Sequence, residues 1–312
     1  MAGLKVPADA QTALIGIDWG TTSFRAYRVD PTGAVIDEVE AAEGITNPPP
    51  GGFEQTFERY VGPWADQYPG APILASGMIT SRNGWCETPY ANAPAGAVEL
   101  AAALTEHRTG AGHTIRFISG LLGADRSGSP DVMRGEETQL VGCAATGISD
   151  GIFVMPGTHS KWATVAASRL TGFRTYMTGE VFAVMRQHSL LGAFIDDNDW
   201  SNAAFEEGIR ASLAGSDSIL HLLFTARSLV LTEHLPASAS SAYLSGLLIG
   251  EELRAAKADL RDDGSVTVVG SGALVDRYVA ALTIAGIPAK PAPDAAVARG
   301  HFEIAKEAGL LQ

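Results

Sequence analysis

The sequence predicts an α/β protein made of two similar domains, each with a mixed sheet. Three observations predict this. The chain has 312 residues, 46% of them hydrophobic, which is enough for two packed cores. Strand and helix patterns alternate along it, and from Gly151 the opening pattern begins again without a literal sequence repeat. We therefore expect domains at residues 1–147 and 148–312, a hinge near 145–151, and a last helix that packs back on the first domain.

The first domain opens with a predicted hairpin. Residues 15–30, "IGIDWGTTSFRAYRVD", alternate apolar and polar positions on both sides of a polar turn, which is typical of two antiparallel strands. A third strand follows, and then a helix over 52–68, where apolar residues recur at helical spacing. The remaining elements expected here are a strand ending at Gly77, a helix over 97–107, a strand over 113–123 and a helix over 130–146.

The second domain repeats this beginning. Residues 151–177 read as strand, polar turn, strand and a third strand. Two helix-rich stretches follow, at 179–234 and 238–258, and residues 265–286 read as a strand, a glycine turn and a helix. A short helical tail over 295–311 ends the pattern.

Composition and charge exclude several classes of function. A formal net charge of −13 argues against the phosphate-backbone contacts that nucleic-acid binding needs. The two cysteines, Cys86 and Cys143, lack the spacing of a zinc site or a disulfide framework, so we expect buried thiols in a reducing compartment. No signal peptide and no apolar run of membrane-spanning length is evident, and we expect a cytoplasmic protein.

The turn of the first hairpin has residues suited to a metal-bound polyphosphate. Asp18 leaves a buried strand just before Gly20, Thr21 and Thr22. A carboxylate can hold Mg²⁺ or its waters, while backbone N–H groups and hydroxyls contact phosphate oxygens. The alternative is a structural hairpin with a polar tip, and this stretch alone favours neither interpretation.

Two further glycine turns have the same ambiguity. In "PGTHSKW", Gly157, Thr158, Ser160 and Lys161 could grip phosphate, whereas His159 is more typical of a hydrogen-bonded structural residue than of a base. In "GSGAL", the stretch Gly270, Ser271 and Gly272 lies between a strand and a helix, where a nucleotide can approach the backbone. Taken singly, each is equally compatible with an ordinary turn.

Two more segments carry candidate catalytic and substrate-binding residues. Glu136 and Glu137 begin a predicted helix, where carboxylates are favoured by the helix dipole but could also act as a general base. The loop after the strand ending at Gly77 offers an arginine whose guanidinium matches a carboxylate bidentately. The substrate-binding candidates in this loop are Ser81, Arg82, Asn83 and Trp85.

Together these segments resemble a known superfamily. "IDWGTTSFRAY", "MPGTHSKWATV" and "VVGSGAL" resemble the first phosphate, second phosphate and adenosine loops of the sugar kinase, actin and heat-shock chaperone ATPases. Within that superfamily, "SGMITSRNGW", "RGEETQLVG" and "PGTHSKW" resemble the 2-dehydro-3-deoxygalactonokinase family, and the likeness runs over essentially the whole chain. The resemblance implies two actin-like ATPase domains, of the ribonuclease H-like fold, flanking a nucleotide cleft.

The resemblance also implies a reaction and roles for the candidates. The reaction would be transfer of the ATP γ-phosphoryl group to the 6-hydroxyl of 2-dehydro-3-deoxy-D-galactonate, with Asp18 acting on Mg²⁺. Glu136 would be the base and Glu137 the reserve, in a place where related kinases carry an aspartate. The residues implied to bind ATP are Gly20, Thr21, Thr22, Gly157, Thr158, Lys161, Gly270, Ser271 and Gly272. Those implied to bind the sugar acid are Ser81, Arg82, Asn83 and Trp85, with Arg82 on its carboxylate.

The expected partners are therefore a small sugar acid and ATP, with a homodimer as a possible assembly and with neither nucleic acid nor a membrane. Rival interpretations are a phosphohydrolase of the same fold, a kinase for a related keto-deoxy sugar acid or other sugar, and a chaperone-like or filament-forming ATPase. The chain has no peptide-binding or basic DNA-binding module, which disfavours the last of these and a sugar-sensing regulator. The sequence does not decide the preferred epimer, the metal or the oligomeric state.

Overall fold

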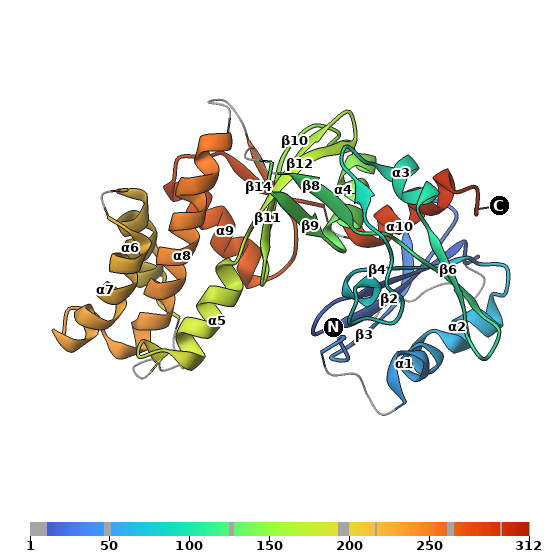
Figure 1. Cartoon of the computed structure of the whole chain (residues 1–312), viewed down its shortest axis with the longest axis horizontal. Coiled ribbons are helices and arrows are strands. Elements are labelled where there is room, and N and C mark those ends of the chain that lie inside the picture. Colours follow the sequence, from blue (N-terminus) through green and yellow to red (C-terminus); the bar gives the residue numbers. More distant parts are fainter. Residues whose placement is uncertain are drawn as a thin grey trace. The chain divides into compact units, whose positions relative to one another are not determined.

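The computed structural model describes residues 11–46, 51–124, 128–192, 200–215, 217–260, 265–293 and 295–311 (Figure 1). Contacts divide the chain into two compact units. The first unit combines residues 1–150, 164–173 and 293–312, and the second combines 151–163 and 174–292. The segment that was expected to form the last helix, residues 295–311, thus belongs to the first unit.

The first unit contains a six-stranded mixed sheet in the order β3-β2-β1-β4-β7-β6. Its strands are β1 Leu14–Trp19, β2 Phe24–Val29, β3 Val35–Ala41, β4 Ile73–Ser76, β6 Thr105–Arg108 and β7 Thr114–Phe117. The predicted opening hairpin is confirmed, because β1 and β2 pair antiparallel with Asp18 opposite Arg25. On its other side β1 pairs parallel with β4, which places Asp18 opposite Ser76. Asp18 therefore lies in the middle of the sheet, near the strand ends.

Helices and a second, three-stranded sheet complete the first unit. The helical segments are α1 Gly52–Tyr60, α2 Gly62–Gln67, the short 3-10 helix η1 Met78–Thr80, α3 Ala97–Ala102, α4 Glu136–Ala145 and α10 Ala296–Glu307. The small sheet has the order β5-β8-β9, with β5 Ala91–Asn92, β8 Leu121–Ala124 and β9 Pro130–Met133. Helix α10 packs on α4, α3 and β1. Gly142 and Gly300 allow the backbones of α4 and α10 to approach closely, since a Cβ at either position would collide with the other helix.

The second sheet repeats the start of the first in the order β12-β11-β10-β13-β14. Its strands are β10 Gly151–Met155, β11 Ser160–Ala166, β12 Arg169–Tyr176, β13 Val266–Val268 and β14 Ala289–Pro291. The helices are α5 Thr178–His188, α6 Asn202–Leu213, α7 Ile219–Leu231, α8 Ser240–Ala256 and α9 Ala273–Ile284, with 3-10 turns at Ala237–Ala239 and Lys257–Asp259. Both sheets thus begin with three consecutive strands whose middle member pairs with the first, and both then add parallel strands, as the repeated pattern predicted.

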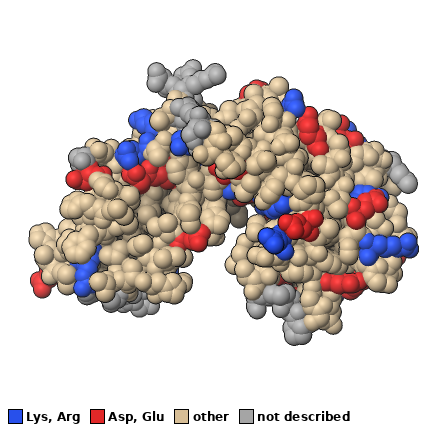
Figure 2. Space-filling model, in the orientation of Figure 1, with Lys and Arg blue, Asp and Glu red and all other residues tan. Residues whose placement is uncertain are grey.

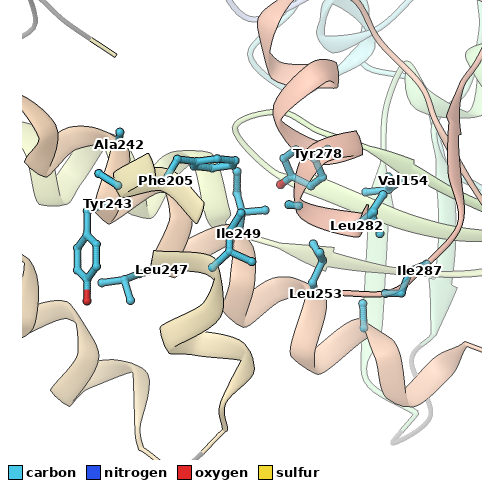
Figure 3. Close-up of a cluster of buried hydrophobic side chains, with 14 of the residues drawn as sticks. Val154, Phe205, Ala242, Tyr243, Leu247, Ile249, Leu253, Tyr278, Leu282 and Ile287 are labelled. Atoms are coloured by element: carbon cyan, nitrogen blue, oxygen red, sulfur yellow. The ribbon is translucent and has the colours of Figure 1, made fainter. Parts of the chain in front are cut away.

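Each unit has its own hydrophobic core. In the first, Trp19, Phe24, Phe57 and Phe117 are fully buried around the sheet. In the second, Phe205 of α6, Ile249 of α8 and Tyr278 of α9 belong to one buried cluster (Figure 3). Burial of such side chains contributes roughly 1.5–3 kcal/mol each, so these clusters are what hold the helices against their sheets.

Three helix predictions differ from the structure in detail. The helix expected over 52–68 is two helices, which break at Val61 before Gly62 and Pro63, because proline cannot donate to the preceding turn. The helix expected over 97–107 ends at Ala102, and residues 105–108 instead pair antiparallel with β7. The helix expected over 130–146 begins only at Glu136, since residues 130–133 form β9 against β8. Residues 105–108 and 130–133 are therefore strands and not helix because each segment pairs with a neighbouring strand.

The surface carries both charges. Figure 2 shows acidic and basic side chains interspersed on the face displayed, without a continuous basic patch there. Within the described ranges, no helix combines the length and the apolar character needed to cross a bilayer.

Candidate active site

The turn between β1 and β2 exposes its hydroxyls. Gly20 N–H donates to the Ser23 carbonyl, which closes the turn. The carbonyls of Gly20 and Thr21 accept from the N–H groups of Ile45 and Thr46, at 3.1 Å each. Thr21 and Thr22 are exposed. The carbonyl oxygens of Gly20, Thr21 and Ser23 are therefore occupied by the protein, whereas the side chains of Thr21 and Thr22 are exposed.

Asp18 is the penultimate residue of β1, beside this turn, and its carboxylate accepts no hydrogen bond from the described part of the chain. Loss of water around the carboxyl group raises its pKa to about 6, and the charge of Arg25 on β2 offsets part of that rise. A half-buried carboxylate with its lone pairs unused is a suitable ligand for a hard cation.

The start of helix α4 lies close to Asp18 because two glycines meet there. A Cβ on Gly77 would lie 3.4 Å from Oδ1 of Asp18 and 2.7 Å from the carbonyl oxygen of Trp19. A Cβ on Gly135 would lie 3.1 Å from the Cα of Gly77. Both glycines have left-handed φ values, 96° and 109°, which larger residues rarely adopt. The end of β1, the start of η1 and the start of α4 therefore converge within the first unit.

The two glutamates at the start of α4 differ in environment. Glu137 is 2% exposed, and both its carboxylate oxygens accept from Gly135 N–H, at 2.9 and 2.8 Å. Burial, together with the charge of Glu136, raises the pKa of Glu137 to about 8. Glu136 is half-buried, and its Oε2 accepts from the Arg134 N–H at 3.1 Å. Glu137 thus accepts from the N-cap residue of its own helix, whereas Glu136 is only half-buried.

Arg134 joins α4 to the loop that carries the predicted sugar-acid residues. Its guanidinium donates to the carbonyl of Thr80 at 2.6 Å and to its hydroxyl at 3.0 Å. It also donates to the hydroxyl and carbonyl of Thr88, at 2.8 Å each, and lies over the ring of Tyr90 at 4.1 Å. Five donors in a planar fork suit this task, which fixes both ends of the 80–88 loop to the residue just before Gly135. Sequence reasoning did not single out Arg134.

The four predicted sugar-acid residues occupy different environments within that loop. Arg82 and Asn83 are exposed. The Oγ atom of Ser81 is buried and has no partner among the described residues, an orphaned group that a ligand hydroxyl could satisfy. Trp85 packs into the core, with ring centroids 5.1 Å from His107 and 5.9 Å from Phe57. The Trp85 indole therefore holds the loop against the hydrophobic core of the first unit.

A buried histidine supports β4 and β1 from the helix side. His301 of α10 is fully buried, with Nε2 2.9 Å from the Ser76 hydroxyl. Its ring lies over Gly16, where a Cβ would approach Nδ1 to 2.7 Å. Burial lowers the pKa of His301 to about 3, so the ring is neutral at ordinary pH. Since Ser76 pairs with Asp18 across the strands, this contact fixes α10 next to the end of β1.

The turn between β10 and β11, in the second unit, also exposes its tip. Thr158 and His159 are exposed, and Nε2 of His159 lies 2.5 Å from Glu180 Oε2. The residues that follow the tip are buried: Ser160 Oγ donates to Glu252 at 2.7 Å, and Nζ of Lys161 donates to the Thr175 hydroxyl at 2.7 Å. Lys161 therefore does not point into solvent.

A pocket of about 270 Å³ lies beside this turn, within the second unit. Gly157 and Thr158 of the turn line it. The remaining lining residues come from α5, α8 and α9: Thr178, Gly179, Phe182, Ser245, Leu248, Ile249, Leu274, Arg277 and Tyr278. A largely apolar cavity with a few polar groups at one edge suits a heterocyclic ligand. The start of α5 comes close to the turn because Gly179 has no side chain, and Glu180 N–H donates to the Thr158 carbonyl at 2.9 Å.

The third predicted loop borders the helix that lines this pocket. Gly270 and Gly272 have φ values of 137° and 68°, and Gly272 is the residue before α9. Gly270, Ser271 and Gly272 are exposed and are absent from the pocket lining, to which Leu274 is the nearest contributor along the chain. Sequence reasoning expected Gly270, Ser271 and Gly272 to bind ATP and did not single out the lining residues of α5 and α8. The dipeptide Thr178–Gly179, which begins α5 two residues after β12 ends, was the available signal.

Among the described residues, no group of three or more His, Cys, Asp or Glu side chains forms a metal site. In phosphoryl-transfer enzymes Mg²⁺ is usually held by one or two carboxylates and the substrate phosphates.

Comparison with known proteins gives a consistent result. A family model described as 2-keto-3-deoxy-galactonokinase matches residues 18–304. A protein from Rhizobium meliloti (strain 1021), named as a probable 2-dehydro-3-deoxygalactonokinase, is 38% identical over 276 residues, which cover 87% of this chain and 89% of that protein. The 2-dehydro-3-deoxygalactonokinase of Escherichia coli (strain K12) is 32% identical over 272 residues, covering 87% of this chain and 90% of that protein.

Two crystal structures extend the comparison. One, described as a candidate 2-dehydro-3-deoxygalactonokinase from Sinorhizobium meliloti, has a TM-score of 0.84 at 37% identity and covers 94% of this chain and 98% of its own. The (R)-2-hydroxyglutaryl-CoA dehydratase component A of Acidaminococcus fermentans has a TM-score of 0.55 at 13% identity, with coverages of 96% and 100%, a likeness of fold alone. The predicted fold class, α/β domains of the actin-like ATPase and sugar kinase type, is confirmed.

Proposed function

The chain belongs to the 2-keto-3-deoxy-galactonokinase family and is a sugar-acid kinase, and we propose that it transfers the γ-phosphoryl group of ATP to the 6-hydroxyl of 2-dehydro-3-deoxy-D-galactonate. The observation that supports the mechanism is the convergence in the first unit of Asp18, which accepts no hydrogen bond from the described residues, with the glutamates that begin α4. A cation ligand and a candidate base would thereby lie in the same region of the first unit.

Asp18 would hold Mg²⁺, directly or through water, together with ATP phosphate oxygens. Its unused lone pairs and half-buried position fit this role. Bound Mg²⁺ supplies neutralisation of the charge that develops on the phosphoryl oxygens. Thr21 and Thr22, which are exposed on the first turn, and Thr158 on the second would contact phosphates, with Lys161 as a nearby positive charge.

The adenosine of ATP would occupy the second unit. The pocket lined by Thr178, Leu274 and Tyr278 has the apolar walls that a purine requires, and Gly270–Gly272 would run along its edge. The nucleotide specificity of the enzyme would then depend in part on residues outside the sequence motifs, such as Thr178 and Tyr278.

Glu136 would act as the general base on the acceptor hydroxyl. It is half-buried beside the Gly135–Gly77 contact, so it combines proximity to Asp18 with access to a ligand. Glu137 is the second choice, because its carboxylate already accepts from the backbone of its own helix. A base in this place accepts the hydroxyl proton as the oxygen attacks phosphorus.

The sugar acid would bind along the loop that Arg134 fixes. Exposed Arg82 is suited to the substrate carboxylate, and the orphaned Ser81 hydroxyl and exposed Asn83 to its hydroxyl groups. A site with an arginine aimed at a carboxylate discriminates against neutral sugars, since leaving such a group unpaired on binding costs affinity.

The test is a coupled ADP-release assay with ATP and Mg²⁺. It compares 2-dehydro-3-deoxy-D-galactonate, its gluconate epimer, neutral sugars and no acceptor, and mass spectrometry identifies the product. We expect release to depend on the keto-deoxy acid and Arg82→Lys to raise the KM for that acid by about tenfold. Equal release without acceptor would instead identify a phosphohydrolase, and equal rates with neutral sugars would refute the role of Arg82.

A further inference from the structure

A buried carboxylate that the sequence did not indicate lies under the second turn. Glu252 of α8 is 2% exposed and accepts four hydrogen bonds, all within the second unit. Its Oε1 accepts from Ser160 Oγ and from Trp162 Nε1, at 2.7 Å each. Its Oε2 accepts from the Tyr278 hydroxyl at 2.8 Å and from the Thr178 hydroxyl. The four donors come from three other elements, β11, α5 and α9.

Only an ionised carboxylate can accept a hydrogen bond from all four of these groups at once, because a protonated carboxyl group must itself donate one. A carboxylate has two oxygens with about four lone-pair directions, and each is used here. The indole N–H of Trp162 can only donate, whereas the three hydroxyls can also accept. Hydrogen bonds to a charged acceptor are stronger than neutral ones, which offsets part of the cost of burying the charge.

Three of the four donors belong to the surroundings of the nucleotide pocket. Ser160 follows the exposed tip of the second turn by two residues. Thr178 of α5 and Tyr278 of α9 both line the pocket. Their hydroxyls are committed to Glu252, so the pocket walls are fixed from behind. Figure 3 shows Tyr278 of α9 together with Leu253, the neighbour of Glu252 on α8, in the same buried cluster.

We propose that Glu252 is a positioning residue for nucleotide binding, which holds the second turn and the pocket-lining residues Thr178 of α5 and Tyr278 of α9 in one geometry. The proposal rests on the proposed nucleotide site and extends it to a residue that does not line the pocket. Without this acceptor, Ser160, Thr178 and Tyr278 lose their common partner and the turn and walls relax independently. A pre-formed site binds more tightly because the ligand does not have to order it.

The first test uses the whole chain and ADP as the probe, with binding measured by calorimetry. Glu252→Gln keeps the shape of the side chain but replaces one carboxylate oxygen, which accepts two hydrogen bonds, with an amide NH₂ group that can only donate. The two groups that donate to that oxygen must then either accept instead or lose their partner. We expect ADP to bind about tenfold more weakly, the KM for ATP to rise in parallel, and the KM for the sugar acid to stay within twofold. Glu251→Gln is the matched control, because the neighbouring Glu251 pairs with exposed Arg254 and, among the described residues, makes no bond to the pocket, so ADP affinity should stay unchanged.

A second pair of variants tests one hydrogen bond without touching the buried charge. Thr178→Val removes the hydroxyl but keeps the shape, whereas Thr178→Ser keeps the hydroxyl. We expect the valine variant to bind ADP several-fold more weakly than the serine variant, which retains the hydroxyl that donates to Glu252. This pair remains informative if Glu252→Gln fails to fold.

The outcomes separate the two proposals. Equal ADP affinity in folded Glu252→Gln and Thr178→Val would overturn the positioning role, as would an equal loss of affinity for ATP and for the sugar acid, which indicates general destabilisation. Absence of ADP binding by the unmodified chain would refute the nucleotide pocket itself, and this inference with it.

Discussion

Asp18 in the first unit and Glu252 in the second are both acidic residues near the turn of a hairpin, but their carboxylates are used in opposite ways. Glu252 is saturated by four protein donors. Asp18 accepts no hydrogen bond in the described part of the chain, and only Arg25 offsets the loss of water around it. The pKa of both carboxyl groups is raised by burial.

The contrast shows how a repeated hairpin can serve two purposes. A saturated carboxylate holds elements together and has no lone pair left for a ligand. A carboxylate without hydrogen-bond donors is destabilised by the loss of water around it in the free protein, and a bound cation removes this destabilisation. We therefore expect changes at the first turn to affect catalysis more than folding, and changes around Glu252 to affect nucleotide affinity.

Asp18→Asn should give the largest effect on the rate. We expect kcat to fall by about 10³-fold, since an amide is a poor ligand for Mg²⁺ and the lost charge stabilisation amounts to several kcal/mol. The unfolding midpoint at pH 7.5 should not fall. Because the folded-state pKa of about 6 exceeds the unfolded value, ionised Asp18 destabilises the fold above that pH, and asparagine removes this penalty. A normal kcat would refute the metal role, and a large drop in the midpoint would show that Asp18 is structural.

Glu136→Gln should give the next largest effect. Removal of a general base lowers kcat by about 10²-fold or more, with little change in the KM for ATP. Glu137→Gln should lower kcat less, because Glu137 already accepts from Gly135 N–H. Steady-state kinetics of the two variants, measured side by side, decide between them. The reverse order of effects would assign the base to Glu137.

Arg134→Lys should act on the sugar acid. Lysine keeps the charge but cannot reproduce the fork that holds Thr80 and Thr88, so the 80–88 loop loses its fixed geometry. We expect the KM for the sugar acid to rise about tenfold while ADP affinity in the second unit is unchanged. Arg59→Lys is the control, since Arg59 is exposed on α1 and pairs with Glu43. An unchanged KM would mean that the loop holds its shape without Arg134.

The sequence predicted the elements whose signals are local. Alternating strands around a glycine-rich turn predicted both hairpins, and the strand, glycine turn and helix at 265–286 were also predicted correctly. The short strands at 105–108 and 130–133 were predicted as helix, because their stability comes from pairing with partners in another part of the chain. The helix or strand propensity of a segment does not depend on such distant partners, so it could not predict these two strands.

The site follows the same rule. The phosphate-loop candidates Asp18 and Thr158 are recognisable because their roles require particular residue types beside glycines. Glu252, by contrast, is an acidic residue in a helix whose nearest donor, Tyr278, is 26 positions away, and Ser160 is 92 positions away. Arg134 likewise bonds to residues 46 and 54 positions away. These residues support the site through three-dimensional contacts that no spacing rule encodes.

The smallest expected effect is a fall in stability with rising pH, which sharpens the comparison of the two units. The pKa of Glu137 is about 8 in the folded chain and near 4.5 when unfolded, so the folded state binds the extra proton and stability decreases as pH rises through this window. Glu252 contributes in the same direction. His301, with its lowered pKa, has the opposite slope, but only below about pH 6.5. Between pH 6.5 and 8, denaturant unfolding should therefore show a loss of at most about 1.4 kcal/mol per pH unit from Glu137. Glu137→Gln should flatten this slope and Glu251→Gln should not, whereas a flat profile in the unmodified chain would mean that Glu137 is already ionised in the fold.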